Sequence, residues 1–166
     1  MALNAILGDA FANSYVTAAE AEVYFEDRMH SSAWDTVDDG DPLLISASQM
    51  LDWYVKWKGD KATAAQARQW PRTDVTRPDG TEIDEDALPP EVKIAVYELA
   101  FMNIGADRTA EDPLAGIGQL KAGSLMIKAG AEKPNQTNPK VIPSHVYQII
   151  SDLYIKSGGT VWLDRA

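Results

Sequence analysis

The chain has 166 residues, the size of one ordinary domain, and its 45% hydrophobic and 24% charged residues are typical of a globular protein. It contains no cysteine and two histidines, which excludes a disulfide framework, a thiolate nucleophile and a zinc site built on cysteine. The formal net charge of −10 is opposite in sign to that of most free nucleic-acid-binding proteins, whose affinity comes largely from neutralising phosphates.

The N-terminal part predicts a flexible lead-in followed by a helix. Residues 1–13 are mildly apolar without a clear period, and they lack the positive region and apolar run of a signal peptide. We therefore expect a protein of a reducing cytoplasm. Thr17 and Glu20 have the spacing of a capping box, which predicts that a helix begins there and runs to Arg28 or His30. Its apolar stripe would be Ala21, Tyr24, Phe25 and Met29.

Residues 31–41 predict a loop, in which aspartates surround Gly40. Their spacing is not that of a calcium-binding loop, so we expect no metal site there. We interpret Asp41 as the N-terminal cap of the next helix instead. That helix should cover residues 43–57, with Gly59 as its C-terminal cap.

The segment of residues 56–77 is basic, with six bases against two acids. Trp53 and Trp57 lie beside it, and aromatics interleaved with bases can stack on single-stranded nucleic acid. The alternative is that both tryptophans pack, as large aromatic side chains usually do. Within the segment we expect a short helical turn over residues 62–69, which ends because a proline, Pro71, follows closely.

Residues 73–88 predict an acidic loop with a tight Pro78-Asp79-Gly80 turn and a small hairpin, anchored by Ile83 and Leu88. A loop of this length in a compact domain indicates a contact surface.

The most apolar stretch, residues 89–106, predicts the central helix of the fold. Pro90 and Glu91 suit its first turn, and the following turns carry only two charges, Lys93 and Glu98. A helix that is apolar on most of its circumference needs cover on several sides. We therefore predict a mainly α fold, a small helical bundle around this helix, with a short β-hairpin and an extended C-terminal arm.

The hairpin is expected near residues 116–129, where glycines alternate with β-branched and apolar residues. We divide the chain into a helical core with this hairpin, residues 1–130, and a C-terminal part, residues 131–166. The latter should hold a polar linker, an amphipathic helix from Pro143 to about Lys156, and an arm with an apolar centre.

The sequence shows no catalytic constellation. Ser144 and His145 are neighbours in the chain, which is not the geometry of a triad, and no glycine-rich phosphate loop follows a strand. We expect a protein that is not an enzyme and that uses neither a metal nor another cofactor.

Several of these residues form a recurring pattern. It consists of Tyr15-x-Thr17-x-x-Glu20-Ala21-x-x-Tyr24, Leu51-Asp52, Gln66-x-x-x-Trp70-Pro71-Arg72, Leu88-Pro89-Pro90-x-Val92 and Ala95-x-x-Glu98-Leu99-Ala100. In this pattern the chain resembles the head–tail connector proteins of tailed phages, also called adaptor or head-completion proteins. Relatives of that family are often labelled DnaT-like ssDNA-binding proteins. The resemblance covers roughly residues 13–130, and the Trp-Pro-Arg element is its most specific part.

The resemblance implies a structural virion protein of the phage neck, assembled in the host cytoplasm. Such proteins form a twelvefold ring that binds the portal and the next tail or neck component. The ring extends a channel through which genomic DNA passes without specific binding, and no membrane is involved. A C-terminal arm would dock on the portal, with Val161, Trp162, Leu163 and Arg165 as candidates. Acids of the long loop could line the channel, because like charge repels phosphate: Asp79, Glu82, Asp84, Glu85 and Asp86.

For the Trp-Pro-Arg element we favour a structural role. Trp70 should pack against the central helix, and Arg72 should pair with Glu98. The competing hypothesis for the whole chain is single-stranded DNA binding through Trp53, Trp57 and the basic segment of residues 56–77.

Overall fold

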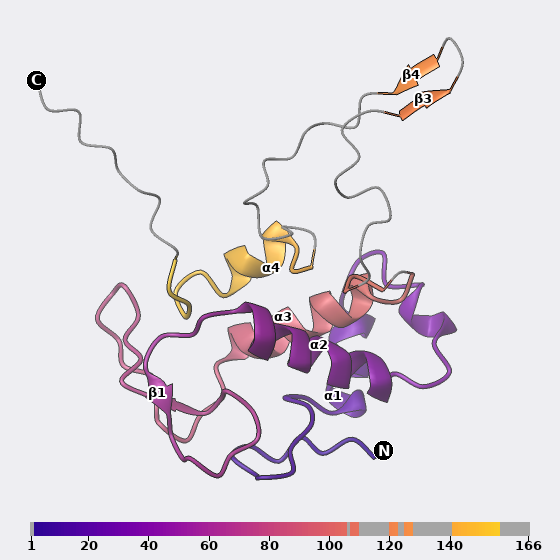
Figure 1. Ribbon diagram of the computed structural model, residues 1–166. Coiled ribbons are helices and arrows are strands. Elements are labelled where there is room, and N and C mark those ends of the chain that lie inside the picture. Colours follow the sequence, from indigo (N-terminus) through magenta and orange to yellow (C-terminus); the bar gives the residue numbers. More distant parts are fainter. Residues whose placement is uncertain (1, 106, 110–119, 123–124, 128–140, 157–166) are drawn as a thin grey trace, which may run out of the picture.

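The computed structural model describes residues 2–105, 107–109, 120–122, 125–127 and 141–156. These residues form a mainly helical fold with two small antiparallel sheets (Figure 1). Its helices are α1 (Ala18–Glu26), a short 3₁₀ helix (Trp34–Thr36), α2 (Asp41–Tyr54), α3 (Pro90–Met102) and α4 (Ser144–Ile149). Its strands are β1 (Asp60–Lys61), β2 (Arg72–Thr73), β3 (Leu120–Ala122) and β4 (Leu125–Ile127).

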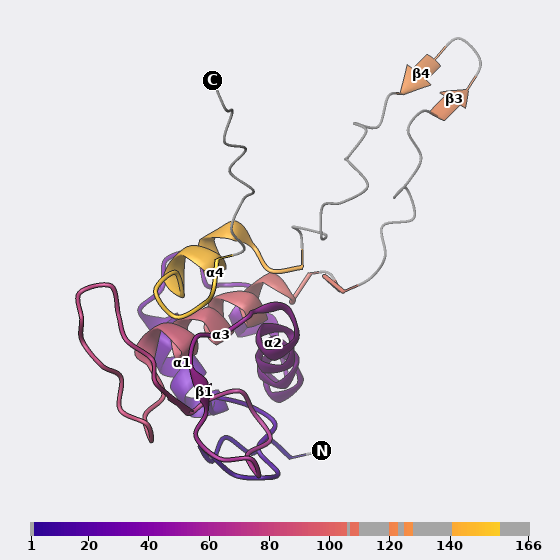
Figure 2. The ribbon, with the colours of Figure 1, turned by 60° about the vertical axis from the view of Figure 1, so that its left-hand side comes forward.

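The central helix is α3, as the sequence predicts. It begins at Pro90, and every residue from Ala95 to Ala100 is buried. In both ribbon views α4 lies along one side of α3, while α1 and α2 lie on the other (Figures 1 and 2). This surrounding cover explains why the helix is apolar on nearly all of its faces. Among the described residues, no helix is long and apolar enough to cross a membrane.

The helix starts follow local chemistry. The Thr17 side chain accepts a hydrogen bond from the Glu20 amide, and the Glu20 carboxylate accepts one from the Thr17 amide, which confirms the capping box. The prediction for α2 is wrong by one position at its start. Gly40 is the N-terminal cap, and Asp41 is already in the first turn, where its charge suits the helix dipole.

Two predicted local features are wrong, the helical turn over residues 62–69 and the cap at Gly59. Residues 62–69 form no helix but a loop. The Gln66 side chain stabilises this loop, because it accepts a hydrogen bond from the Thr63 amide at 2.9 Å and donates one to the Pro71 carbonyl at 3.0 Å. Because α2 ends at Tyr54, Gly59 caps no helix. It adopts φ of 65°, and a Cβ there would lie 2.0 Å from the carbonyl oxygen of Thr73 on the facing strand.

The N-terminal residues pack on the domain, which corrects the expected flexible lead-in. The Asn4 amide donates to the Asn13 side chain at 2.7 Å, and the Asn4 carbonyl accepts from the Asn13 amide at 2.9 Å. The Asp9 carbonyl accepts from the Ala67 amide at 3.1 Å, which ties this loop to the segment before the Trp-Pro-Arg element.

Both predicted hairpins are present. In the long loop, Thr76 pairs with Glu82 across a turn in which Gly80 adopts φ of 87°, and Ile83 and Leu88 pack against the core. The second hairpin pairs β3 with β4 in the register Leu120 to Ile127, Lys121 to Met126 and Ala122 to Leu125. The linker over residues 131–139 and the arm after Lys156 lie outside the described residues.

Candidate nucleic-acid interface

Aromatic side chains gather where the C-terminal segment meets the end of α2. Trp53 and Tyr54 close this helix, and the chain after α4 runs back beside residues 56–58. The Ile155 amide donates to the Lys56 carbonyl at 2.7 Å, and the Lys58 amide donates to the Leu153 carbonyl at 3.0 Å. We call the four aromatic residues of this junction the aromatic edge: Trp53, Tyr54, Tyr147 and Tyr154.

The members of the aromatic edge are accessible to different degrees. Trp53 is 69% exposed and Tyr54 is 46% exposed, whereas Tyr147 and Tyr154 are half-buried. The Tyr147 hydroxyl donates to the Tyr54 carbonyl at 3.2 Å, and the rings of Tyr147 and Tyr154 lie 5.4 Å apart. Burial, followed by the proximity of Tyr154, raises the pKa of Tyr147, so its hydroxyl stays protonated at neutral pH.

Sequence reasoning missed Tyr147 and Tyr154, because only the fold brings them to the end of α2. Their spacing of seven residues gave no usable signal. Tyr147 lies in α4, which ends at Ile149, whereas Tyr154 lies beyond this helix, so a helical period does not relate the two side chains.

The basic segment of residues 56–77 has mostly internal partners. Lys58 donates to the Asp152 carbonyl at 2.7 Å, Arg68 pairs with Asp52 at 3.2 Å, and Arg77 pairs with Glu91 at 2.7 Å. Lys61 and Arg72 donate to backbone carbonyls. Lys56 is exposed, and its side chain has no partner in the described part of the chain. A phosphate near the aromatic edge would therefore meet one free cation of this segment rather than six.

Trp57 cannot serve as a stacking platform. It is 5% exposed and meets Trp70 edge to face, with ring centroids 5.7 Å apart. Trp70 has no exposed surface and belongs to the same core cluster as the buried residues of α3. Of the two tryptophans in the single-stranded DNA hypothesis, the structure leaves Trp53 available and makes Trp57 a core residue.

Residues of the recurring pattern meet around the backbone of the Trp-Pro-Arg element. The Tyr15 hydroxyl donates to Asp52 and accepts from the Gln69 amide at 3.0 Å and the Trp70 amide at 3.3 Å. Burial is the main cause that raises the pKa of both Tyr15 and Asp52. This network positions the element at the root of the long loop.

The predicted pairing of Arg72 with Glu98 is wrong. Arg72 donates to the carbonyls of Lys58, Gly59 and Gln69, with an Nε distance of 2.7 Å to Lys58. Its guanidinium therefore satisfies backbone acceptors of the turn before β1, which lies close in space. Burial lowers the pKa of Arg72 from its ordinary value.

Glu98 binds Arg28, which extends from the segment after α1. Two parallel contacts join them, Nε to Oε1 at 2.7 Å and Nη2 to Oε2 at 2.9 Å. The Tyr24 hydroxyl donates to Oε1 at 2.7 Å, and His145 Nε2 lies 3.7 Å from Oε2. The hydrogen bond from Arg28 is the main cause that lowers the pKa of Glu98, and the cluster joins α1, α3 and α4.

The other predicted site residues are not members of the aromatic edge. The five acids of the long loop are all exposed: Asp79, Glu82, Asp84, Glu85 and Asp86. The arm candidates are outside the described residues: Val161, Trp162, Leu163 and Arg165. Among the described residues, no three histidine, aspartate or glutamate side chains come together to hold a metal ion.

Comparison with known families supplies a match over nearly the whole chain. The family described as "Putative DnaT-like ssDNA binding protein" matches residues 4–166. The chain belongs to this family. The matched span includes the helical bundle and every residue of the aromatic edge, but it does not carry the head–tail connector role that the sequence resemblance implies. No curated protein and no solved structure gives a significant match.

Proposed function

We propose that this protein binds single-stranded DNA and that bases stack on the aromatic edge. The observation that carries the proposal is the 69% exposure of Trp53 at the end of α2, in a chain of the DnaT-like family. An indole that remains in solvent beside Tyr54 and the free Lys56 offers a stacking face that every base can use. The internal partners of the other bases in this segment favour stacking over phosphate contacts as the source of affinity.

The net charge shapes the expected binding. With a net charge of −10, the protein repels phosphates at long range, so association gains little from electrostatic steering. One or two lysines near the aromatic edge would release few counterions. We therefore expect a shallow salt dependence, with a log–log slope of roughly −1 rather than the steep slopes of basic single-strand binders.

Replacement of Trp53 by alanine should weaken binding of a labelled oligothymidine by about tenfold, because the loss of one stacked base costs about 1–3 kcal/mol. Fluorescence anisotropy at two salt concentrations would measure the affinity and the slope. Trp53→Phe should keep most of the affinity, since a ring remains. Met29→Ala, at a position that is 79% exposed outside the aromatic edge, is the matched control for loss of an exposed apolar side chain. Equal affinities of wild type and Trp53→Ala, or no binding at all, would refute the proposal.

The acidic long loop favours a second candidate function, a structural role in the phage neck. In this proposal copies of the chain form a ring that connects the portal to the tail, and the loop lines the DNA channel. Five exposed acids lie on the hairpin of the long loop or directly after it, and the ion pair of Arg77 with Glu91 ties the turn end of this hairpin to α3. Such a surface lets DNA slide without adhering, because like charges repel.

Reversal of the five loop acids to lysine should slow DNA ejection from assembled phage while leaving the fold intact, since all five positions are exposed. Negative-stain images of the protein mixed with portal would first establish whether rings form on portals. Ejection kinetics and infectivity of phage carrying the reversed loop would then test the channel. Portals without rings, or unchanged ejection, would speak against this role.

A further inference from the structure

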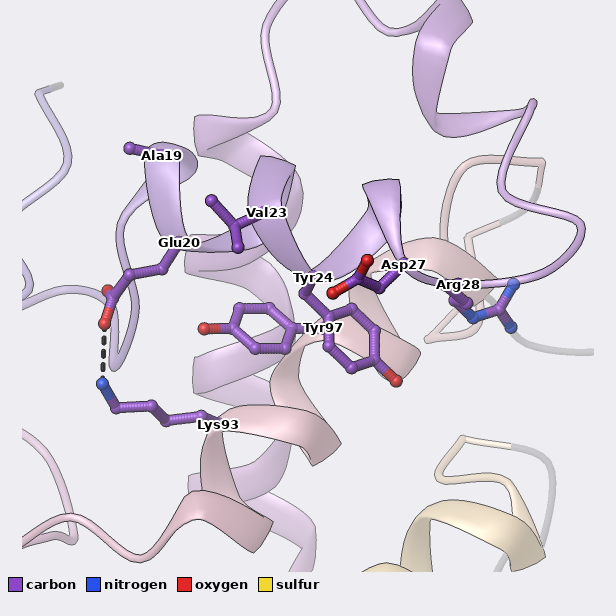
Figure 3. A pocket seen from close by; sticks show the side chains of 8 residues that line it. All are labelled: Ala19, Glu20, Val23, Tyr24, Asp27, Arg28, Lys93 and Tyr97. Carbon is purple, nitrogen blue, oxygen red and sulfur yellow. Dashed lines mark hydrogen bonds and ion pairs between the residues drawn. The ribbon is translucent and has the colours of Figure 1, made fainter.

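An apolar groove runs between α1 and α3, on a face that neither proposed function uses. One stripe of α1 forms its first wall, with Ala19, Val23 and Asp27 four residues apart, and α3 contributes Lys93 and Tyr97 (Figure 3). The hollow has a volume of about 720 Å³. Val23 is 63% exposed, although large apolar side chains gain free energy when they are buried.

The floor of the groove is aromatic and its rims are charged. The rings of Tyr24 and Tyr97 stack with centroids 4.7 Å apart and an interplanar angle of 27°. At one end Lys93 pairs with Glu20 at 2.6 Å. At the other end Arg28 is committed to Glu98, whereas Asp27 has no ion-pair partner among the described residues. The groove thus offers an apolar centre and one free negative charge at a defined end.

The direction of the groove follows from its ion pairs. Glu20 meets Lys93 early in both helices, and Arg28 meets Glu98 later, so α1 and α3 run parallel. The described chain approaches from the start of α3. The pKa of Arg77 is raised, mainly by its hydrogen bond to Glu91 in the first turn of α3. The charge of Asp152 also contributes to this shift, so Asp152 lies near the start of α3. A segment that continues past Lys156 can therefore enter at the Lys93 end.

The last ten residues of the sequence have a matching order of chemistry. After two glycines and Thr160 come three consecutive large apolar residues, Val161, Trp162 and Leu163, and then Asp164 and Arg165. An extended run from Val161 to Arg165 spans about 13 Å at ~3.3 Å per residue. The α1 stripe from Ala19 to Asp27 spans about 12 Å at ~1.5 Å per residue. The apolar centre and the terminal cation can therefore align with the floor and with Asp27 together.

We propose that the C-terminal residues Thr160–Ala166 dock in the α1–α3 groove of their own chain. Trp162 covers the stacked pair of Tyr24 and Tyr97, its neighbours cover Val23, and Arg165 pairs with Asp27. The docked residues take up most of the chain after Lys156, so the steps from Lys156 to Thr160, about 13 Å when extended, are what bridges to the Lys93 end of the groove. The docked segment removes the exposed apolar surface of α1 from water.

Disulfide trapping in the full chain tests this arrangement, because the native sequence has no cysteine to compete. Val23→Cys combined with Leu163→Cys should form an intramolecular disulfide under mild oxidation, at least fivefold more than Trp53→Cys combined with Leu163→Cys. Trp53 is a matched control because its exposure of 69% is close to that of Val23. Non-reducing electrophoresis and mass spectrometry identify the product.

Charge exchange gives an independent readout of the same contact. Asp27→Lys in the trapping variant should lower the disulfide yield about threefold, and a further Arg165→Glu should restore it. Equal yields for the Val23 and control pairs would overturn the proposal, as would a product that links two chains instead of one. These outcomes leave single-stranded DNA binding untouched, because neither Val23 nor Leu163 belongs to the aromatic edge.

Discussion

Replacement of Trp70 by alanine should lower the free energy of unfolding by about 4 kcal/mol, the largest loss expected from one core side chain of this protein. Trp70 has no exposed surface and meets the ring of Trp57 edge to face at 5.7 Å. Its removal opens a cavity between the long-loop root and the helical core, and the Tyr15 network above it limits how far the backbone can collapse. Urea denaturation followed by circular dichroism would measure the change.

The matched control is Trp53→Ala, which removes the same side chain from a position that is 69% exposed. Its cost should stay below about 0.5 kcal/mol, because exposed side chains away from special contacts contribute little to stability. The two substitutions also separate stability from binding. Trp70→Ala should lower stability, whereas Trp53→Ala should lower affinity for single-stranded DNA and leave the unfolding midpoint unchanged. A similar stability loss in both variants would contradict the assignment of Trp70 to the core and Trp53 to the surface.

The sequence predicts those features that a few neighbouring residues determine. The capping box at Thr17 and Glu20 is complete within four residues, and the apolar character of α3 follows from the residues of the helix itself. The turn at Gly80 needs a positive φ that glycine adopts without strain, so the hairpin in the long loop is also predictable. In each case the physical cause lies inside the element itself.

The partners of long side chains are not determined locally, and the errors concentrate there. Arg28 and Arg72 were both available to Glu98, and the fold selects Arg28 because α1 lies parallel to α3. Tyr24 and Arg28 are four residues apart and both bind Glu98, so this spacing of two polar side chains at the end of the first predicted helix was the signal for the cluster. Arg72 donates instead to carbonyls of the turn before β1, which the fold brings beside it.

The same limit applies to the candidate interface. Trp53 and Trp57 are equivalent in sequence, since both are aromatic residues near lysines. Their difference arises because α2 ends at Tyr54, so the chain turns after Trp53 and carries Trp57 inward against Trp70. Tyr147 and Tyr154 come to this junction from more than ninety residues away, through a hydrogen bond to the Tyr54 carbonyl and the bridge of Trp57 with Tyr154. Periodicity carries no information about such a distant meeting.

Glu98→Ala should lower the free energy of unfolding at pH 7 by about 3 kcal/mol, because it leaves Arg28 without the partner that compensates its partial burial. The Glu98 carboxylate is largely buried and accepts from Arg28 through both oxygens, and from Tyr24 as well. The loss includes the contacts that this one carboxylate makes with Tyr24 of α1 and His145 of α4. Thermal and urea unfolding of the variant against wild type would measure it, with Glu91→Ala as the control. Glu91 pairs with Arg77 through side chains that are 28% and 24% exposed, so its removal should cost less than about 1 kcal/mol.

The pH dependence tests whether charge is the cause of this loss. Because Arg28 lowers the pKa of Glu98 below the ordinary value of 4.5, the folded state binds the proton of this carboxyl more weakly than the unfolded chain does. The stabilisation by Glu98 is therefore fully present above pH 4.5 and is lost as the pH falls through the folded pKa.

Glu98→Gln keeps the shape of the side chain and removes the titration. The stability difference between wild type and Glu98→Gln should be greatest above pH 4.5 and shrink as the pH falls below it. A difference that stays constant over this range would mean that packing and hydrogen bonding, rather than the charge of Glu98, hold α1 and α4 on α3.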